Sequence, residues 1–174
     1  MRRMDSVSIR TDLPRLLPAL RAYGRALCRN PQQADDLVQE TILRALRAEG
    51  QFEPGTELRA WLFTILRNCW LGQLRRAGRE RRAMEAQRPE EQAGPSQGDR
   101  LALGELAQAM DALPVAQREA LILVGAEGMT TAQAAAVVGV PEGTIKARVS
   151  RARNALRTML AQPAAEAVSL HPTP

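Results

Sequence analysis

A short segment of the chain combines side chains that suit a nucleic-acid strand. Aromatic rings stack on bases, amides form hydrogen bonds with them, and guanidinium groups pair with phosphates. The same mixture is compatible with a core tryptophan whose neighbouring arginines keep the surface solvated. Composition alone leaves these two interpretations open. The residues concerned are Asn68, Trp70, Gln73, Arg75 and Arg76.

A second basic segment covers residues 141–160 and follows the pattern of a recognition helix. The segment TTAQAAAVV predicts a short helix, Gly139 a tight turn, and the following residues a longer helix. The longer helix has an apolar stripe that includes Ile145 and Val149, and its other side carries Lys146 and Arg151. This layout favours DNA binding in the major groove, although helix-turn-helix geometry also occurs in bundles that bind no DNA.

The overall charge agrees with a polyanionic partner but is unevenly distributed. The chain has 24 Lys and Arg residues against 19 Asp and Glu residues, a net charge of +5. Residues 32–57 are acidic instead, and a helix expected from Gln33 to Ala48 places Asp36, Glu40 and the apolar Leu43 on one side. This side is either a solvated face with one stray leucine or a protein-binding surface.

The sequence contains no recognisable catalytic or metal-binding equipment. The single histidine, His171, and the two cysteines, Cys28 and Cys69, are too few for a four-ligand zinc site. Both cysteines have apolar neighbours, which favours reduced, buried thiols. No nucleotide-binding or hydrolase motif is present. We therefore expect no enzymatic activity, no cofactor and no small-molecule substrate.

The elements that would position these residues are all predicted to be helices. Aromatic residues make up 3% of the chain and no long stretch alternates apolar with polar residues, so strands are not expected. Helices are predicted from Leu13 to Arg29, Gln33 to Ala48, Leu58 to Arg76, Leu101 to Leu113, Val115 to Val124, Thr130 to Val138 and Pro141 to Leu160. The fold class is therefore all-α.

A break in composition divides the chain into two small helical domains. Between Arg81 and Asp99 only Met84 is large and apolar, and turn-forming residues accumulate, which predicts a flexible linker. Domains of this size are marginal alone, so docking onto a large partner would suit both. The predicted divisions are a first domain over 10–80, a linker over 81–100, a second domain over 101–162 and a polar tail over 163–174.

The compartment predicted from the sequence is the cytoplasm. No apolar run approaches the roughly 20 residues that a membrane-spanning helix needs. The first residues, MRRMDSVSIRTD, lack the apolar core of a secretory signal. We expect no membrane insertion.

Three motifs in register resemble the extracytoplasmic-function (group IV) sigma factors of bacterial RNA polymerase. QADDLVQETILRALR resembles the segment that grips the polymerase clamp, and RAWLFTILRN the promoter-melting segment. The stretch from LPVAQREALILV through EGTIKARVSRARNAL resembles sigma region 4. The resemblance implies a region 2 bundle and a region 4 helix-turn-helix, joined by the linker.

The resemblance also implies roles for individual residues. Asn68 would help to capture a flipped base of the minus-ten element, with arginines and Trp70 flanking the separated strand. The implied core-polymerase face consists of Asp35, Asp36, Leu37, Gln39, Glu40 and Leu43. The minus-ten residues would be Arg67, Asn68, Trp70, Arg75 and Arg76, and the minus-thirty-five residues Thr131, Thr144, Lys146, Ala147, Ser150 and Arg151.

Within this family, QFEPGTELRAWLFTILRN and LILVGAEG are most similar to the alphaproteobacterial general-stress subgroup typified by EcfG. The implied partners are core RNA polymerase, promoter DNA and a NepR-like anti-sigma factor. Two alternatives remain at this point. A sigma mimic that sequesters an anti-sigma factor would have a degraded basic helix or acidic face, and both are intact. An autonomous helix-turn-helix regulator would bind duplex DNA without polymerase.

Overall fold

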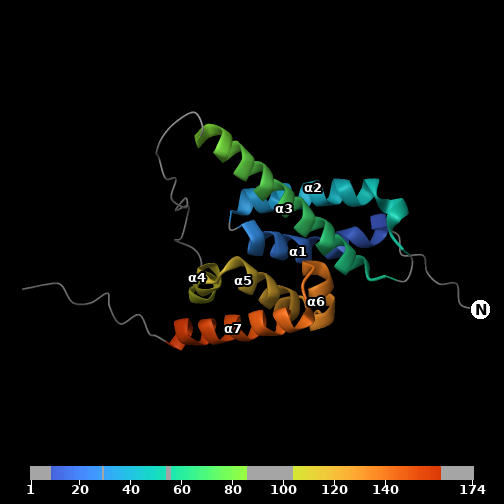
Figure 1. Cartoon of the computed structure of the whole chain (residues 1–174). Helices are drawn as coiled ribbons and strands as arrows, with labels where there is room; N and C mark the ends of the chain where they lie inside the picture. Colours follow the sequence, from blue (N-terminus) through green and yellow to red (C-terminus); the bar gives the residue numbers. More distant parts are fainter. Residues whose placement is uncertain (1–8, 29, 54–55, 86–103, 162–174) are drawn as a thin grey trace, which may run out of the picture.

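The described part of the chain is built from helices, as the sequence predicts. The computed structural model describes residues 9–28, 30–53, 56–85 and 104–161, and within these ranges no strand is found. None of the helices in these ranges is long and apolar enough to cross a membrane. The first lobe contains α1 (Ile9–Cys28), α2 (Pro31–Arg47), the 3-10 turn η1 (Glu49–Gln51) and α3 (Leu58–Glu85) (Figure 1). The second lobe contains α4 (Glu105–Ala112), α5 (Val115–Leu121), the π-helical turn η2 (Ile122–Ala126), α6 (Thr131–Val138) and α7 (Glu142–Ala161).

Helices α1 and α2 form an antiparallel pair whose connection is set by local sequence. The side chain of Asn30 caps α2 by accepting a hydrogen bond from the backbone N–H of Gln33 at 3.2 Å. Helix α1 begins at Ile9, earlier than the predicted Leu13, and continues through Pro14 and Pro18. Ile9 is buried in the core and extends the apolar stripe by one turn. Both proline rings lie on the exposed side.

Helix α3 is longer than the sequence predicted. It was expected to end near Arg76, but it continues to Glu85 and so includes the first residues of the predicted linker, which began at Arg81. This extension is rich in arginine, glutamate and alanine, which favour helix, and it contains no proline. The rest of the predicted linker and the predicted tail lie outside the described residues.

The helix-turn-helix of the second lobe has well-defined ends. Thr130 and Gln133 form a capping box at the start of α6, with hydrogen bonds of 3.1 Å and 2.8 Å. Gly139 ends α6 in the left-handed conformation, with φ of 71°. Ile145 and Val149 of α7 then pack into the core. The predicted short helix, glycine turn and long helix are confirmed.

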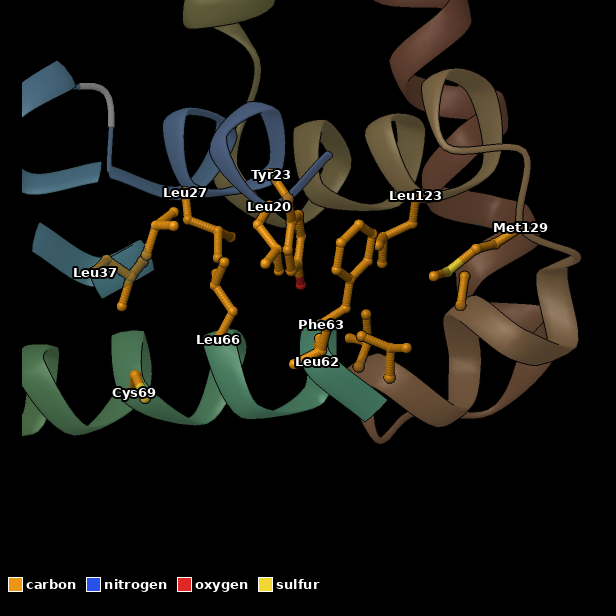
Figure 2. Close-up of a cluster of buried hydrophobic side chains, with 14 of the residues drawn as sticks. Leu20, Tyr23, Leu27, Leu37, Leu62, Phe63, Leu66, Cys69, Leu123 and Met129 are labelled. Atoms are coloured by element: carbon orange, nitrogen blue, oxygen red, sulfur yellow. The ribbon is translucent and has the colours of Figure 1, made fainter. Parts of the chain in front are cut away.

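The two lobes pack against each other and share one hydrophobic core. Helix α1 contacts α5, and α3 contacts α6. Tyr23 and Phe63 stack with ring centroids 4.9 Å apart, and the cluster that holds them also includes Leu123 and Met129 of the second lobe (Figure 2). The sequence predicted two marginal domains that would dock onto a large partner. In this structure each lobe buries apolar side chains against the other lobe.

Candidate nucleic-acid and protein interfaces

Helix α2 carries an acidic face with one exposed leucine. Asp36 and Gln39 are exposed, Asp35 and Glu40 are partly buried, and the side chain of Leu43 is 55% exposed. These five residues are called the acidic face below. Leu37, which the sequence also assigned to the polymerase-binding surface, is fully buried in the core. That assignment is wrong for Leu37, because its position in the helix repeat directs the side chain inward.

Glu40 connects the acidic face to helix α3. Arg44 donates a hydrogen bond to Glu40 Oε1 at 2.6 Å, and Gln73 donates one to Oε2 at 3.0 Å. Arg21 of α1 lies 3.9 Å from the carboxylate of Asp35. Arginine side chains of the same chain therefore screen part of the negative charge of the acidic face. Of its three carboxylates, only Asp36 is classed as exposed.

Helix α3 has one side that is buried in the core and another side that is predicted to bind the minus-ten strand. Leu62, Leu66 and Cys69 are buried, as predicted. Asn68 is exposed, and Trp70 is partly buried, which leaves part of its ring accessible for stacking. Arg75 and Arg76 are both exposed.

The basic surface extends beyond the residues identified from the sequence. Leu74, Arg75, Gly78, Arg79 and Arg82 line a shallow hollow near the end of α3. Arg79 and Arg82 were not assigned a role, because the helix was expected to end near Arg76. Arg75, Arg79 and Arg82 are spaced three to four residues apart, so these three arginines share one side of the helix.

Helix α7 presents its basic side to solvent. Lys146, Ala147, Ser150 and Arg151 are exposed, while Ile145, Val149 and Ala152 are buried. The predicted division into an apolar inner side and a polar outer side is confirmed from Ile145 to Ala152, whereas Met159, which the same spacing places on the inner side, is exposed. Arg151 Nε donates to the Ala147 carbonyl oxygen at 3.3 Å, so the side chain lies along its own helix.

A carboxylate lies among the residues predicted to contact the minus-thirty-five element. Glu142 accepts hydrogen bonds from Thr131 at 2.6 Å and from Lys146 at 2.8 Å. These bonds stabilise the charged form and lower the pKa of Glu142. The structure thus brings Thr131 and Lys146 together. Thr144, at the start of α7, is partly buried.

Arg67 lies apart from the other residues predicted to bind the minus-ten strand. Its Nε donates to Glu119 Oε1 of α5 at 2.8 Å, and its side chain is only 18% exposed. Tyr23 donates to the same oxygen at 2.8 Å. Burial and the neighbouring carboxylate raise the pKa of Tyr23 well above its ordinary value.

The contacts between the lobes are the feature that sequence reasoning missed. Arg118 is 2% exposed and donates to the Ala26 carbonyl oxygen across the interface. Its signal in the sequence is the charged pair Arg118 and Glu119, which directly precedes the apolar run ALILV. Two adjacent charges at core-facing positions of a short helix indicate partners from elsewhere in the fold.

The thiols show no sign of redox pairing. Cys28 and Cys69 are both free, and burial raises the pKa of each. Within the described ranges, no group of three or more metal-ligating side chains gathers at one place.

Comparison with known proteins identifies both lobes. Residues 14–80 match the family model for Sigma-70 region 2, and residues 103–156 match that for Sigma-70, region 4. The chain is 46% identical over 154 residues to the ECF RNA polymerase sigma factor EcfG of Rhodopseudomonas palustris (strain TIE-1), covering 88% of this chain and 85% of that protein. It is 37% identical to the ECF sigma factor SigM of Mycobacterium tuberculosis (strain ATCC 25618 / H37Rv), covering 81% of this chain and 71% of that protein.

Solved structures agree with these matches. The sigma factor RpoE of Bartonella quintana, in complex with the anti-sigma factor NepR, has a TM-score of 0.74 and 43% identity, with 88% of this chain and 96% of that chain covered. CnrH in complex with the cytosolic domain of CnrY has a TM-score of 0.62 and 28% identity, with 88% and 87% covered.

The two matched segments correspond to the two lobes, in the order that the sequence motifs indicated. The acidic face and the α3 residues lie in the first segment, and the helix-turn-helix lies in the second. The similarity to EcfG extends across both segments. This chain therefore belongs to the extracytoplasmic-function sigma factors of bacterial RNA polymerase, is EcfG-like, and acts in promoter recognition and transcription initiation.

Proposed function

We propose that the acidic face of α2 is the surface by which this sigma factor binds core RNA polymerase. This proposal rests mainly on Leu43, a large apolar side chain that is 55% exposed and lies one helical turn from Glu40. An exposed leucine within a polar rim is suited to be an anchor at a protein interface. Asp36 and Gln39 complete the rim, and their carboxylate and amide groups suit a basic partner surface.

We infer that the exposed side of α3 holds the separated minus-ten strand. Asn68 is accessible for hydrogen bonds to a flipped base, and the accessible part of Trp70 offers a stacking surface. The arginines at the end of α3 supply cations for the backbone. Arg79 and Arg82 extend this set beyond Arg75 and Arg76.

We propose that α7 contacts the minus-thirty-five element as a duplex. Lys146, Ser150 and Arg151 form its outward side, and the small side chain of Ala147 leaves space for close approach of a base edge. Glu142 neutralises part of the charge at the start of the helix, which weakens attraction to phosphates there. Thr131 and Thr144 lie at the first turns of α6 and α7, where backbone N–H groups suit phosphate oxygens, and the Thr131 hydroxyl would exchange its bond to Glu142 for one to a phosphate.

We propose that a NepR-like anti-sigma factor controls this chain. We also propose that the genes transcribed with this sigma factor serve the general stress response. The similarity to EcfG and to a sigma factor solved with NepR supports this proposal. The protein would then act by binding, without catalysis, and in the cytoplasm where the polymerase works. Its specificity would come from the two DNA surfaces.

Reconstitution with core polymerase tests the assignment. The purified chain should bind core polymerase in a pull-down and support run-off transcription from promoters mapped after its overexpression. The Leu43→Ala variant should bind core less tightly and melt at the parent temperature. Nanomolar binding of promoter duplex at physiological salt without core polymerase would instead identify an autonomous regulator.

A further inference from the structure

The buried carboxylate of Glu119, in the second lobe, forms a hydrogen bond with Arg67 of the first lobe, an arginine predicted to bind DNA. Glu119 Oε1 accepts hydrogen bonds from Arg67 Nε and from the Tyr23 hydroxyl, each at 2.8 Å. The side chain of Glu119 is 3% exposed, and Tyr23 is fully buried. We call Tyr23, Arg67 and Glu119 the interlobe cluster. Tyr23 lies within the core that joins the two lobes (Figure 2).

Further contacts hold α5 and η2 over the same surface of the first lobe. Arg59 pairs with Glu127, and its guanidinium lies 5.6 Å from the centre of the Phe63 ring. Glu119 of α5 pairs with Arg67, and Glu127, which directly follows η2, pairs with Arg59, so both carboxylates lie on the side of this segment that faces α3. This side, with Leu123 between the two carboxylates, faces two arginines of α3.

The acidic side of α5–η2 resembles a strand of phosphates in its chemistry. A guanidinium group pairs with carboxylate and phosphate oxygens through the same donors and with similar geometry. Arg67 directly precedes Asn68, which is exposed on the adjacent side of α3. With its Nε donor held by Glu119, Arg67 has little guanidinium surface left for a phosphate.

We propose that Arg59 and Arg67, the two arginines of α3 that pair with carboxylates of the second lobe, bind the phosphate backbone of single-stranded promoter DNA, and that Glu119 competes with this DNA for Arg67. The inference rests on the proposed function of α3 as the strand-binding helix. The docked second lobe and the bound strand then exclude each other at Arg67. The second lobe must leave this surface before the full set of strand contacts can form.

The free energy of burying a charged group explains how this competition can regulate strand binding. A carboxylate buried as deeply as Glu119 is stable only while its hydrogen-bond donors remain in place. When the lobes separate, Glu119 returns to water and Arg67 becomes available to a new anion. DNA binding and lobe separation are therefore linked, and each must favour the other by the same factor.

Substitution of Glu119 in the full chain tests the competition. The probe is a short, fluorescently labelled single-stranded deoxyoligonucleotide that carries the mapped minus-ten sequence, measured by anisotropy. Glu119→Ala should bind it about tenfold more tightly than the parent, the size expected for loss of one competing charge-assisted hydrogen bond. The control Glu105→Ala, at an exposed carboxylate on α4, should bind as the parent does.

The double variant separates competition from a general charge effect. Arg67→Ala combined with Glu119→Ala should lose the gain in affinity, because the arginine that Glu119 releases is absent. If Glu119→Ala gains no affinity while Arg67→Ala or Arg76→Ala weakens strand binding, the competition is refuted and the strand-binding role of α3 stands. If substitution of Arg67, Asn68 and Arg76 leaves strand binding unchanged in the parent and in Glu119→Ala, both proposals fail.

A measurement on the unmodified protein guards against a folding defect in the variants. Saturation with the same oligonucleotide should accelerate hydrogen exchange of the backbone amides of α5, because the strand displaces the helix from α1 and α3. The amides of α2 and of α7 should keep their protection. Unchanged exchange in α5 at saturation would refute the competition independently of any substitution.

Discussion

Gln73 of α3 donates a hydrogen bond to Glu40 of α2, with 3.0 Å between Nε2 and Oε2. This bond joins the helix proposed to hold the minus-ten strand to the face proposed to bind polymerase. Because Arg44 occupies the other carboxylate oxygen at 2.6 Å, Glu40 is held from two sides. Glu40 therefore contributes to the local fold as well as to the surface, and Asp36 is the cleaner position for a test.

Reversal of charge at Asp36 should weaken binding to core polymerase without unfolding the protein. We expect Asp36→Lys to cost roughly 1 to 3 kcal/mol of binding free energy, because it places a cation where a basic partner surface is expected. The melting temperature should stay unchanged, since Asp36 is exposed. Calorimetry or pull-down with core polymerase measures the first effect, and thermal unfolding the second.

Two matched variants complete this test. Asp36→Lys combined with Glu40→Lys should abolish core binding, and the Glu40 change should also lower the melting temperature because it removes the bonds to Arg44 and Gln73. Glu53→Lys, an exposed charge reversal in the loop before α3, should bind core normally. Parental affinity of Asp36→Lys and of Leu43→Ala would refute the proposed polymerase surface.

Replacement of Asn68 by alanine should impair promoter melting more than recruitment. A side chain that holds a flipped base contributes only after the strands separate. Permanganate footprinting of the minus-ten region, at equal occupancy of promoter by holoenzyme, should show reduced reactivity of unpaired thymines. Equal reactivity of variant and parent would assign Asn68 no role in melting.

Replacement of Arg151 by alanine should reduce transcription at promoters that depend on the minus-thirty-five element. If Arg151 contacts a base, the loss should be roughly 1 to 3 kcal/mol and specificity should relax at one position. If it contacts a phosphate, all sequences should weaken alike and the salt slope should fall by about one. Run-off assays on single-base promoter variants at several salt concentrations distinguish the two. The same loss in Arg157→Ala, further along α7, would show that Arg151 has no special role.

Two glycines near the recognition helix should respond to alanine in opposite directions. Gly139 has φ of 71°, where a side chain is strained, so Gly139→Ala should destabilise the protein by about 1 to 2 kcal/mol. Gly143 lies within α7, and a Cβ there would meet nothing within 4 Å. Gly143→Ala should therefore stabilise by about 0.5 to 1 kcal/mol. Chemical denaturation measures both changes, and a stable Gly139→Ala variant would contradict the role assigned to the turn.

The hydroxyl of Tyr23 should make the stability of the parent protein sensitive to alkaline pH. Burial and Glu119 raise the pKa of Tyr23, while Arg67 opposes this shift. A group whose pKa is higher in the folded state stabilises the fold below its unfolded pKa, and this contribution is lost as pH rises through the folded pKa. The parent should therefore lose stability above about pH 10, the ordinary tyrosine range.

The Tyr23→Phe variant supplies the comparison. It should be less stable than the parent near neutral pH by about 1 kcal/mol, because a buried hydrogen bond is lost. Above about pH 10 the difference should shrink, since the variant has no hydroxyl to ionise. Tyr23 is the only tyrosine in the sequence, so ultraviolet absorbance reports its ionisation directly. Parallel pH profiles of the two proteins would contradict the interlobe cluster.

The helical elements and most of the outward-facing residues could be predicted from local sequence patterns. Apolar spacing of three to four residues located the buried sides of α2, α3 and α7, and the helix predicted from Thr130 located the start of α6. The exposed Leu43 and the basic side of α7 followed from the same helix repeat. These features depend on neighbours within about two turns, so local sequence is sufficient to place them.

Features that depend on contacts between distant segments could not be predicted in this way. Glu119 is 52 residues from Arg67 and 96 from Tyr23, and no local pattern predicts that they meet. The family resemblance placed Leu37 on the polymerase-binding face and Arg67 beside the strand, and a motif position does not report depth. Leu37 is buried within the first lobe, where α2 packs on α1 and α3. Arg67 is covered by α5 from the other half of the chain, because the burial of a side chain depends on which element packs over its helix face.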